Sequence, residues 1–333
     1  METFISESES TRLISHESAF EAVRKALIAA ASAEAKVFPA VIAHASDRQN
    51  TFSLKSGSTP ELACFKVGSF WPDNPAKGRP RHSSTIFLID QDSGRIGALV
   101  EASAVNAYRT AAADAVAAQA LARPGSETLA VFGAGNQALF ECCALARILP
   151  LKRLHVVARN RDKASAFAID LLSRGLKLDI RVSMAEEACR QADVIVTATP
   201  SRVPLFDPEW VPPGTHIAGM GSDARGKQEL PSELFERAKL FCDLPEQSIQ
   251  IGEFQHVRER IERGELVLNA IGALLEGRCS GRIARDDITI FDSSGIALQD
   301  LYIGQFLLSM SEVAQNHEVR VVQSEANPSA PIK

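Results

Sequence analysis

Hydrophobic positions in the first part of the chain follow the helix period and the strand period in turn. Between residues 17 and 34, apolar side chains recur every three or four positions, which predicts an amphipathic helix. Two apolar runs, 85–89 and 96–100, are separated by a polar turn that contains glycine and predict a β-hairpin. The segment from about 104 to 122 is rich in alanine and precedes a Pro-Gly pair, which predicts a second helix.

After residue 125 the pattern changes to continuous apolar strands that alternate with helices. Such strands are buried on both faces, so they predict a parallel sheet covered by helices on both sides. The predicted strands are 128–132, 154–157, 193–198, 216–218, 240–242 and 288–291. We therefore predict an α/β protein with a Rossmann-type doubly wound domain over 125–300. Residues 1–124 and 301–323 would form an antiparallel α+β domain, and 324–333 a mobile tail.

Composition excludes several classes of protein. The chain has 333 residues, is 45% hydrophobic and 23% charged, and carries a dispersed net charge of -5, which argues against disorder and against nucleic-acid binding. The first ten residues are acidic and unlike a secretory signal, and Asp114 and Gln119 interrupt the longest alanine-rich run, so we expect no membrane span. The six cysteines form no C-x-x-C pair, which favours reduced cysteines, no structural metal and a cytoplasmic protein.

The sharpest motif is Gly133-Ala134-Gly135-Asn136-Gln137-Ala138, which lies between a predicted strand and a predicted helix. In a dinucleotide fingerprint the first glycine makes the turn and the second lets the backbone approach a pyrophosphate. The third position must be small for helix packing. The helix N-terminus then offers N–H groups to the phosphates. A tight turn alone could also explain the glycines, but the strand–helix–strand context predicts a dinucleotide site.

The end of the second predicted strand distinguishes between cofactors. An NAD-binding protein usually places a carboxylate there for the ribose hydroxyl, but this chain has Arg159, Asn160 and Arg161. Guanidinium groups suit a 2′-phosphate, so NADP(H) is the preferred cofactor and NAD(H) remains possible. A solvated loop with two ordinary arginines would also fit this segment. The remaining expected cofactor contacts are Thr199, Met220 and Ser222.

Asp223 and several cations are the candidates for substrate chemistry. Asp223 follows a predicted strand, where ligands of doubly wound sheets bind, and could relay protons or simply cap a helix. Lys66 interrupts an apolar strand, so its ammonium group needs a partner, and a substrate carboxylate is a natural one. Arg109 begins the alanine-rich helix and could bind a carboxylate through two parallel hydrogen bonds. Each cation could instead pair with an acidic residue of the fold.

Together these motifs resemble the ornithine cyclodeaminase/μ-crystallin family. The segments that carry the resemblance are 66–74 with Gly78 and Pro80, 109–112, 133–138, 221–230 and 291–300. The resemblance implies a homodimer whose subunit joins a Rossmann domain to an antiparallel domain for dimerisation and substrate binding. It implies that Lys66 and Arg109 hold the substrate carboxylate and that Asp223 is the acid/base group. Gly133, Gly135, Asn136 and Gln137 would line the pyrophosphate.

Two departures from the cyclodeaminase pattern favour the imino-acid reductases of this family. The segment 39–44 lacks the arginine that many cyclodeaminases carry after a proline. Arg48 and the segment 52–57 instead resemble the reductases, which makes Lys55 a second expected carboxylate contact. The Ala158-Arg159 pair replaces the acidic residue of an NAD-binding strand end, as suits a reductase that consumes NADPH.

The sequence therefore predicts NAD(P)H-dependent reduction of a small 2-imino acid, such as Δ1-pyrroline-2-carboxylate, to the L-amino acid. Lys66 and Arg109 would orient the substrate, and Asp223 would protonate the imine nitrogen. An iminosuccinate reductase that produces L-aspartate is a second possibility. In that case the second carboxylate would be held by the surplus cations His44, Arg48, Lys55, Arg81 and His82. An ornithine cyclodeaminase and a non-catalytic protein that binds a dinucleotide or another ligand would also fit the sequence.

Overall fold

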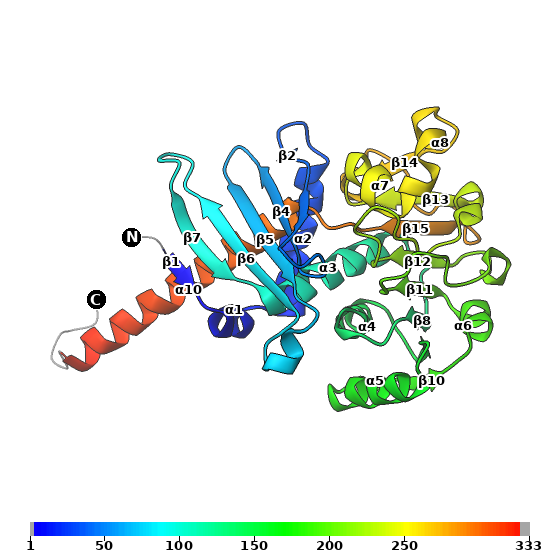
Figure 1. Cartoon of the computed structure of the whole chain (residues 1–333), viewed down its shortest axis with the longest axis horizontal. Coiled ribbons are helices and arrows are strands. Elements are labelled where there is room, and N and C mark those ends of the chain that lie inside the picture. Colours follow the sequence, from blue (N-terminus) through cyan, green and yellow to red (C-terminus); the bar gives the residue numbers. More distant parts are fainter. Residues whose placement is uncertain (1–2, 327–333) are drawn as a thin grey trace.

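The protein is described by a computed structural model that covers the chain from Thr3 to Ala326, with side chains described as far as Ala314. Two sheets organise the chain, one in its first third and one in the middle (Figure 1). The α-helices are α1 (Glu7–Leu13), α2 (His16–Ala30), α3 (Ser103–Leu121), α4 (Asn136–Ile148), α5 (Arg161–Ser173), α6 (Ala185–Gln191), α7 (Pro245–Ile251), α8 (Arg258–Glu262), α9 (Ile271–Leu275) and α10 (Ala297–Ala326). Short 3-10 helices are η1 (Asn74–Lys77), η2 (Pro208–Trp210), η3 (Ser232–Arg237) and η4 (Glu253–Val257).

The first sheet has seven strands in the order β1-β7-β6-β5-β4-β2, with β3 paired to β4. Its strands are β1 (Thr3–Ile5), β2 (Lys36–Val37), β3 (Val41–His44), β4 (Thr51–Ser58), β5 (Ala63–Phe70), β6 (His82–Ile89) and β7 (Ile96–Glu101). The predicted hairpin is confirmed, because β6 pairs with β7 in antiparallel register. The sheet is mixed rather than purely antiparallel, since β1 runs parallel to β7. A parallel strand of only three residues leaves too short a pattern to be read from the sequence.

The second sheet has eight strands, all parallel, in the order β10-β9-β8-β11-β12-β15-β13-β14. Its strands are β8 (Thr128–Phe132), β9 (Arg153–Val157), β10 (Asp179–Val182), β11 (Val194–Thr197), β12 (His216–Gly219), β13 (Ala238–Cys242), β14 (Leu268–Ala270) and β15 (Ile288–Asp292). The central strands are buried along their whole length, as the continuous apolar runs predict. The two edge strands β10 and β14 were not predicted, because they are short and only partly buried.

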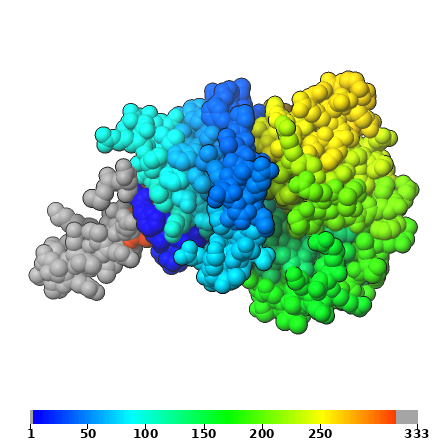
Figure 2. All heavy atoms as spheres, in the orientation of Figure 1, coloured from blue at the N-terminus to red at the C-terminus, as the bar shows by residue number. Residues whose placement is uncertain are grey.

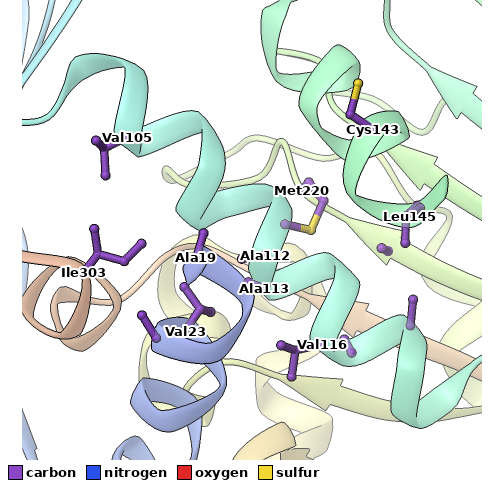
Figure 3. Close-up of a cluster of buried hydrophobic side chains, with 14 of the residues drawn as sticks. Ala19, Val23, Val105, Ala112, Ala113, Val116, Cys143, Leu145, Met220 and Ile303 are labelled. Carbon is purple, nitrogen blue, oxygen red and sulfur yellow. The ribbon is translucent and has the colours of Figure 1, made fainter. Parts of the chain in front are cut away.

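Helix α3 lies between the two sheets and joins their cores. Its many alanines have almost no exposed surface, so α2, α4 and other elements approach it closely from several sides. Figure 3 shows this packing, with Ala112 and Ala113 of α3 between Ala19 of α2 and Met220. In the space-filling view the part built on the first sheet lies directly against the part built on the second (Figure 2).

Helix α10 returns from β15 to the first sheet and packs against β4, β5, β6 and α2. Its helical backbone includes residues 324–326, the beginning of the predicted mobile tail, whereas 327–333 lie outside the described residues. All six cysteines are free thiols, and every one except the half-buried Cys279 is buried. Within the part of the chain that the structure describes, none of the helices combines the length and the apolar character needed to cross a membrane.

Candidate active site

Two lysines lie side by side on neighbouring strands of the first sheet. Lys55 of β4 and Lys66 of β5 are directly paired in the antiparallel register, so their side chains leave the same face of the sheet. Lys66 Nζ donates to Asp300 Oδ1 at 2.9 Å and to Asn106 Oδ1 at 2.7 Å. Lys55 Nζ instead donates to the backbone carbonyl oxygens of Ser294 and Gly295 at 3.0 and 2.7 Å. The Lys55 ammonium thus points toward the connection between β15 and α10, and the Lys66 ammonium toward α10 and α3.

Arg109 of α3 adds a third cation to this cluster. Its Nε and Nη2 donate to Asn106 Oδ1 at 3.2 and 3.0 Å, and its Nη1 donates to Gln299 Oε1 at 3.1 Å. Its Nε also lies 3.7 Å from Asp300 Oδ1. Gly295, whose φ is +73°, lies directly against the guanidinium group, because a side-chain carbon at this position would be 2.5 Å from Nη1.

Burial and mutual repulsion disfavour the charged forms of the two lysines in this cluster. Desolvation lowers the pKa of Lys66 to about 8, although the adjacent Asp300 carboxylate acts in the opposite direction. Desolvation also lowers the pKa of Lys55, and the positive charge of Arg109 adds to this effect. A bound anion would relieve the mutual repulsion of these cations. The predicted carboxylate ligands Lys55, Lys66 and Arg109 are therefore brought together in one place.

Asp223 lies in the loop after β12, near enough to this cluster for the charges of Lys55 and Arg109 to act on its carboxyl group. Its side chain is 56% exposed and forms an ion pair with Lys227. Partial desolvation favours the neutral carboxyl, but the charges of Lys227, Lys55 and Arg109 outweigh it and lower the pKa of Asp223. Asp223 is thus a carboxylate at neutral pH. The residues that follow it form turns, so the hypothesis that Asp223 caps a helix is wrong.

A buried acidic network supports the loops around this site. Glu229 accepts hydrogen bonds from the Thr197 hydroxyl at 2.8 Å and from the backbone N–H groups of Thr199 and Gly221 at 2.6 and 2.8 Å. It thereby ties together the ends of β11 and β12. Glu253 in turn accepts from the backbone N–H groups of Glu229 and Leu230. Neither structural role was predicted, because both depend on contacts between distant segments.

Further members of the site were also missed by residue-level reasoning. Asn106 lies one helical turn before Arg109, so helix spacing is the signal that could have identified it. Asp300 binds Lys66 across 234 positions of the chain, and Gln299 binds Arg109 across 190. No local pattern carries such contacts; they follow from the return of α10 onto the first sheet.

The glycine motif adopts the geometry expected of a dinucleotide loop. Gly133 follows β8 with a φ of +119°, and a side-chain carbon there would lie 2.7 Å from the Ala198 carbonyl oxygen. Only glycine fits this position. Gly135 precedes α4, has no atom within 4 Å of the place a side chain would occupy, and leaves the helix N-terminus without a side-chain cap. Ala138 is completely buried, as the third position of the motif requires.

The other predicted cofactor residues take several positions. Arg159, Asn160 and Arg161 are exposed beyond the end of β9, beside the glycine loop, and Asn160 Oδ1 also caps α5 by accepting from the Lys163 N–H at 2.9 Å.

Thr199 lies beyond the end of β11, and its N–H donates to Glu229. Ser222 is buried with its hydroxyl directed at the Lys227 carbonyl oxygen at 3.3 Å. Met220 is directed into the core between α3 and α4 (Figure 3). Solvent thus reaches the exposed Arg159, Asn160 and Arg161, and Thr199 in part, whereas Met220 and Ser222 are buried.

The remaining predicted substrate residues lie at one end of the first sheet. His82 begins β6 with its ring 4.8 Å from that of Phe70. Burial lowers the pKa of His82, and the negative charge of Asp223 counteracts part of this effect, so His82 belongs to the surroundings of the site. Arg48 is exposed in the turn between β3 and β4, and Arg81 and His44 are exposed as well. These three residues do not join the buried cluster.

Comparison with known proteins identifies the family of this chain. Residues 2–310 match the model of the ornithine cyclodeaminase/mu-crystallin family. The iminosuccinate reductase of Paracoccus denitrificans is 34% identical over 320 residues, which are 95% of this chain and 99% of that protein. Its crystal structure in complex with NAD+ superposes with a TM-score of 0.85 at 33% identity, covering 94% of this chain and 97% of that one.

Two further solved structures share the whole fold. An archaeal alanine dehydrogenase dimer with bound NAD has a TM-score of 0.86 and 32% identity, with 95% of this chain and 97% of that chain covered. The Δ1-pyrroline-2-carboxylate reductase of Thermococcus litoralis, in complex with NADH and L-proline, has a TM-score of 0.85 and 28% identity, with 95% and 98% covered. Because the family model and full-length relatives agree, this chain belongs to the ornithine cyclodeaminase/mu-crystallin family.

Proposed function

We propose that this protein is an NAD(P)H-dependent oxidoreductase that reduces the C=N bond of a small 2-imino acid to give the L-amino acid. The observation that carries the proposal is the convergence of Lys55, Lys66 and Arg109 on one buried place, near enough to Asp223 for the charges of Lys55 and Arg109 to lower its pKa. This place lies at the carboxyl ends of the parallel strands, where doubly wound sheets bind their ligands. The iminosuccinate and Δ1-pyrroline-2-carboxylate reductases among the relatives support the same reaction class.

The glycine loop and the start of α4 fit a nicotinamide dinucleotide. Gly135 leaves open space in front of the helix N-terminus, where a pyrophosphate would accept hydrogen bonds from backbone N–H groups. Arg159 and Arg161 are exposed at the end of β9, where they would pair with a 2′-phosphate. We therefore propose NADP(H) as the preferred cofactor and NAD(H) as a second possibility. The bound reduced nicotinamide supplies the hydride.

The residues of this chain bind and polarise the substrate. Arg109 and Lys66 hold its carboxylate, and Lys55 contributes a further positive charge whose present partners are backbone carbonyl groups. These contacts with the carboxylate would hold the imine carbon within reach of the hydride donor. Because Asp223 is ionised, its role is to stabilise the protonated imine through a charge-assisted contact rather than to bring a proton of its own. Lys227 holds the Asp223 carboxylate in place.

Two substrates suit this site. A cyclic imino acid such as Δ1-pyrroline-2-carboxylate presents one carboxylate and is the first choice. Iminosuccinate is the second candidate, because the charges around the site favour it: the four cations Lys55, Lys66, Arg109 and Lys227 outnumber the three carboxyl groups that act on them, Asp300, Asp223 and Asp243. That surplus of positive charge would accommodate a second substrate carboxylate.

The test is oxidation of NADPH or NADH by the purified protein, followed through the loss of nicotinamide absorbance. The substrates are Δ1-pyrroline-2-carboxylate, Δ1-piperideine-2-carboxylate and iminosuccinate formed in place. Faster turnover with a cyclic imine supports the first choice, and faster turnover with iminosuccinate supports the second. No oxidation with any of them contradicts the proposal. Release of ammonia from ornithine would then indicate a cyclodeaminase, and dinucleotide binding alone a non-catalytic protein.

A further inference from the structure

Two buried carboxyl groups that the proposed reaction does not use face each other between α3 and α4. Asp114 of α3 and Glu141 of α4 have no exposed surface. Glu141 Oε1 accepts a hydrogen bond of 2.7 Å from Gln137 Nε2. Both oxygens of Asp114 and Glu141 Oε2 receive no hydrogen bond from any donor that the structure describes. The remaining oxygens can satisfy each other only if a proton lies between them.

Gln137 connects this pair to the dinucleotide loop. It is the second residue of α4, two positions after the last glycine of the motif, and its side-chain amide also donates to the Ala107 carbonyl oxygen of α3 at 3.3 Å. Ala107 in turn lies two residues before Arg109. One amide therefore links Glu141, the first turn of the cofactor helix and the helix that carries the substrate-binding arginine.

Burial determines how the pair titrates. Desolvation raises the pKa of Asp114 to about 7, and desolvation together with the charge of Asp114 raises the pKa of Glu141 well above its usual range. The charged and titratable groups that act on the pair are Arg109, which lowers the pKa of Glu141, and Cys142, whose own pKa is raised by burial so that it stays a neutral thiol. Glu141 thus keeps its proton, and Asp114 exchanges its own near neutral pH.

We propose that Asp114 and Glu141 form a proton-sharing pair that regulates dinucleotide binding, with tight binding when both carboxyls are protonated and weaker binding when Asp114 is ionised. In the ionised state Glu141 Oε2–H donates to the Asp114 carboxylate, Oε1 still accepts from Gln137, and the pair carries one negative charge. The inference rests on the proposed dinucleotide site and is independent of which imino acid is reduced.

The expected size of the effect follows from helix geometry. Glu141 is five residues beyond Asn136, or about 7.5 Å along α4, so the pair lies about 10 Å behind a pyrophosphate at the helix N-terminus. Repulsion of like charges at this distance in a partly buried setting corresponds to about a tenfold loss of affinity. By linkage, dinucleotide binding must then be accompanied by proton uptake near neutral pH.

Two isosteric variants lock the two states. In Asp114→Asn the amide oxygen accepts the Glu141 O–H, which mimics the fully protonated pair. In Glu141→Gln the new amide donates to Asp114 and favours its carboxylate, which mimics the charged pair. Dissociation constants of NADPH and NADH are measured by nicotinamide fluorescence between about pH 6 and 9, a range that spans the Asp114 pKa of about 7, without any imine.

The unaltered protein should lose about tenfold in affinity across this range. Asp114→Asn should keep the tight affinity throughout, and Glu141→Gln the weak one. Lys66→Met, which removes a second buried group whose pKa lies in this range, should leave the pH dependence of dinucleotide binding in place. Calorimetry of the unaltered protein in two buffers of different ionisation enthalpy should detect proton uptake on binding, which needs no variant.

Equal pH profiles in the unaltered protein, Asp114→Asn and Glu141→Gln would overturn this inference while leaving the proposed function intact. Absence of dinucleotide binding by the unaltered protein at every pH would overturn both. Melting temperatures distinguish a purely structural role. Raised folded-state pKa values cost stability as pH rises, so Asp114→Asn should be the more stable protein above pH 7. A constant melting difference without any change in affinity would contradict the coupling to the cofactor.

Discussion

Lys66 illustrates how a single residue reveals a site. An ammonium group in an apolar strand predicts an anionic partner, and the structure supplies Asp300 at 2.9 Å. The sequence could predict the need for a partner, but the partner itself is 234 residues away and depends on the fold. Lys66 therefore does pair with an acidic residue of the fold, as a purely structural role would require. Because Arg109 shares this one carboxylate with Lys66 and Lys55 adds a further charge, the three cations keep positive charge for a substrate.

The pKa of Lys66 predicts how carboxylate binding depends on pH. The ammonium form exists below a pKa of about 8 and is lost above it, so affinity for a substrate carboxylate should fall as pH rises. The inhibition constant of pyrrole-2-carboxylate, which does not titrate in this range, should rise by about tenfold for each pH unit above the break. In Asp300→Asn the break should move to lower pH, because the Asp300 charge raises the pKa of Lys66. An inhibition constant that is unchanged between about pH 7 and 10 would contradict this role, since ionisation should change it across that range.

The proposed role of the Asp223 carboxylate in turnover can be tested by a single substitution. In Asp223→Asn the amide cannot stabilise a protonated imine, so kcat should fall by about 100-fold. The dissociation constant of NADPH should change much less, because the Asp223 side chain pairs with Lys227 and its proposed role is toward the imine rather than the dinucleotide. Steady-state kinetics and a fluorescence titration measure the two effects. If turnover is unchanged while cofactor binding is normal, Asp223 has no part in catalysis.

At the level of elements, predictions succeeded where one segment contains its own signal. The predicted helix over 104–122 is α3, and the apolar runs of the second part are the central strands of a parallel sheet. The predictions missed the short strands β1, β10 and β14, whose pairing is imposed by their neighbours. The dinucleotide motif was predictable because strand, glycines and helix follow one another directly. The supporting network of Glu229 and Glu253 was not, since it joins four separate segments.

The two glycines of the motif should respond differently to alanine. Gly133→Ala places a side-chain carbon against the Ala198 carbonyl oxygen at a φ of +119°, which should destabilise the protein by about 1–3 kcal/mol. Gly135→Ala meets no atom within 4 Å and has an ordinary backbone conformation, so its melting temperature should be normal. Dinucleotide affinity should nevertheless fall in Gly135→Ala, because the methyl group occupies the approach to the pyrophosphate. Normal affinity together with normal stability in Gly135→Ala would place the cofactor elsewhere.

At the scale of the whole molecule, the first sheet has an outer face with exposed apolar side chains, and a partner is needed to cover it. Lys55 and Lys66 leave the inner face, so Leu54 and Val67, which pair with each other, leave the opposite one. Phe65 and Phe87 stack on this outer face with ring centroids 4.5 Å apart. We propose that a second copy of the chain covers this apolar face. Residues 1–124 with 301–323 would then form the domain for dimerisation and substrate binding.

The dimer proposal can be tested by one charge on this face. Leu54 is 37% exposed, so Leu54→Glu should leave the single chain folded but place a carboxylate in an apolar interface, where desolvation makes it costly. Light scattering after size exclusion should give a dimer mass for the unaltered protein and half that mass for the variant. Leu172→Glu is the matched control, because Leu172 is 52% exposed on α5 and should leave the mass unchanged. A single-chain mass for the unaltered protein, or a Leu54→Glu variant that remains a dimer, would show that a second copy does not use this face.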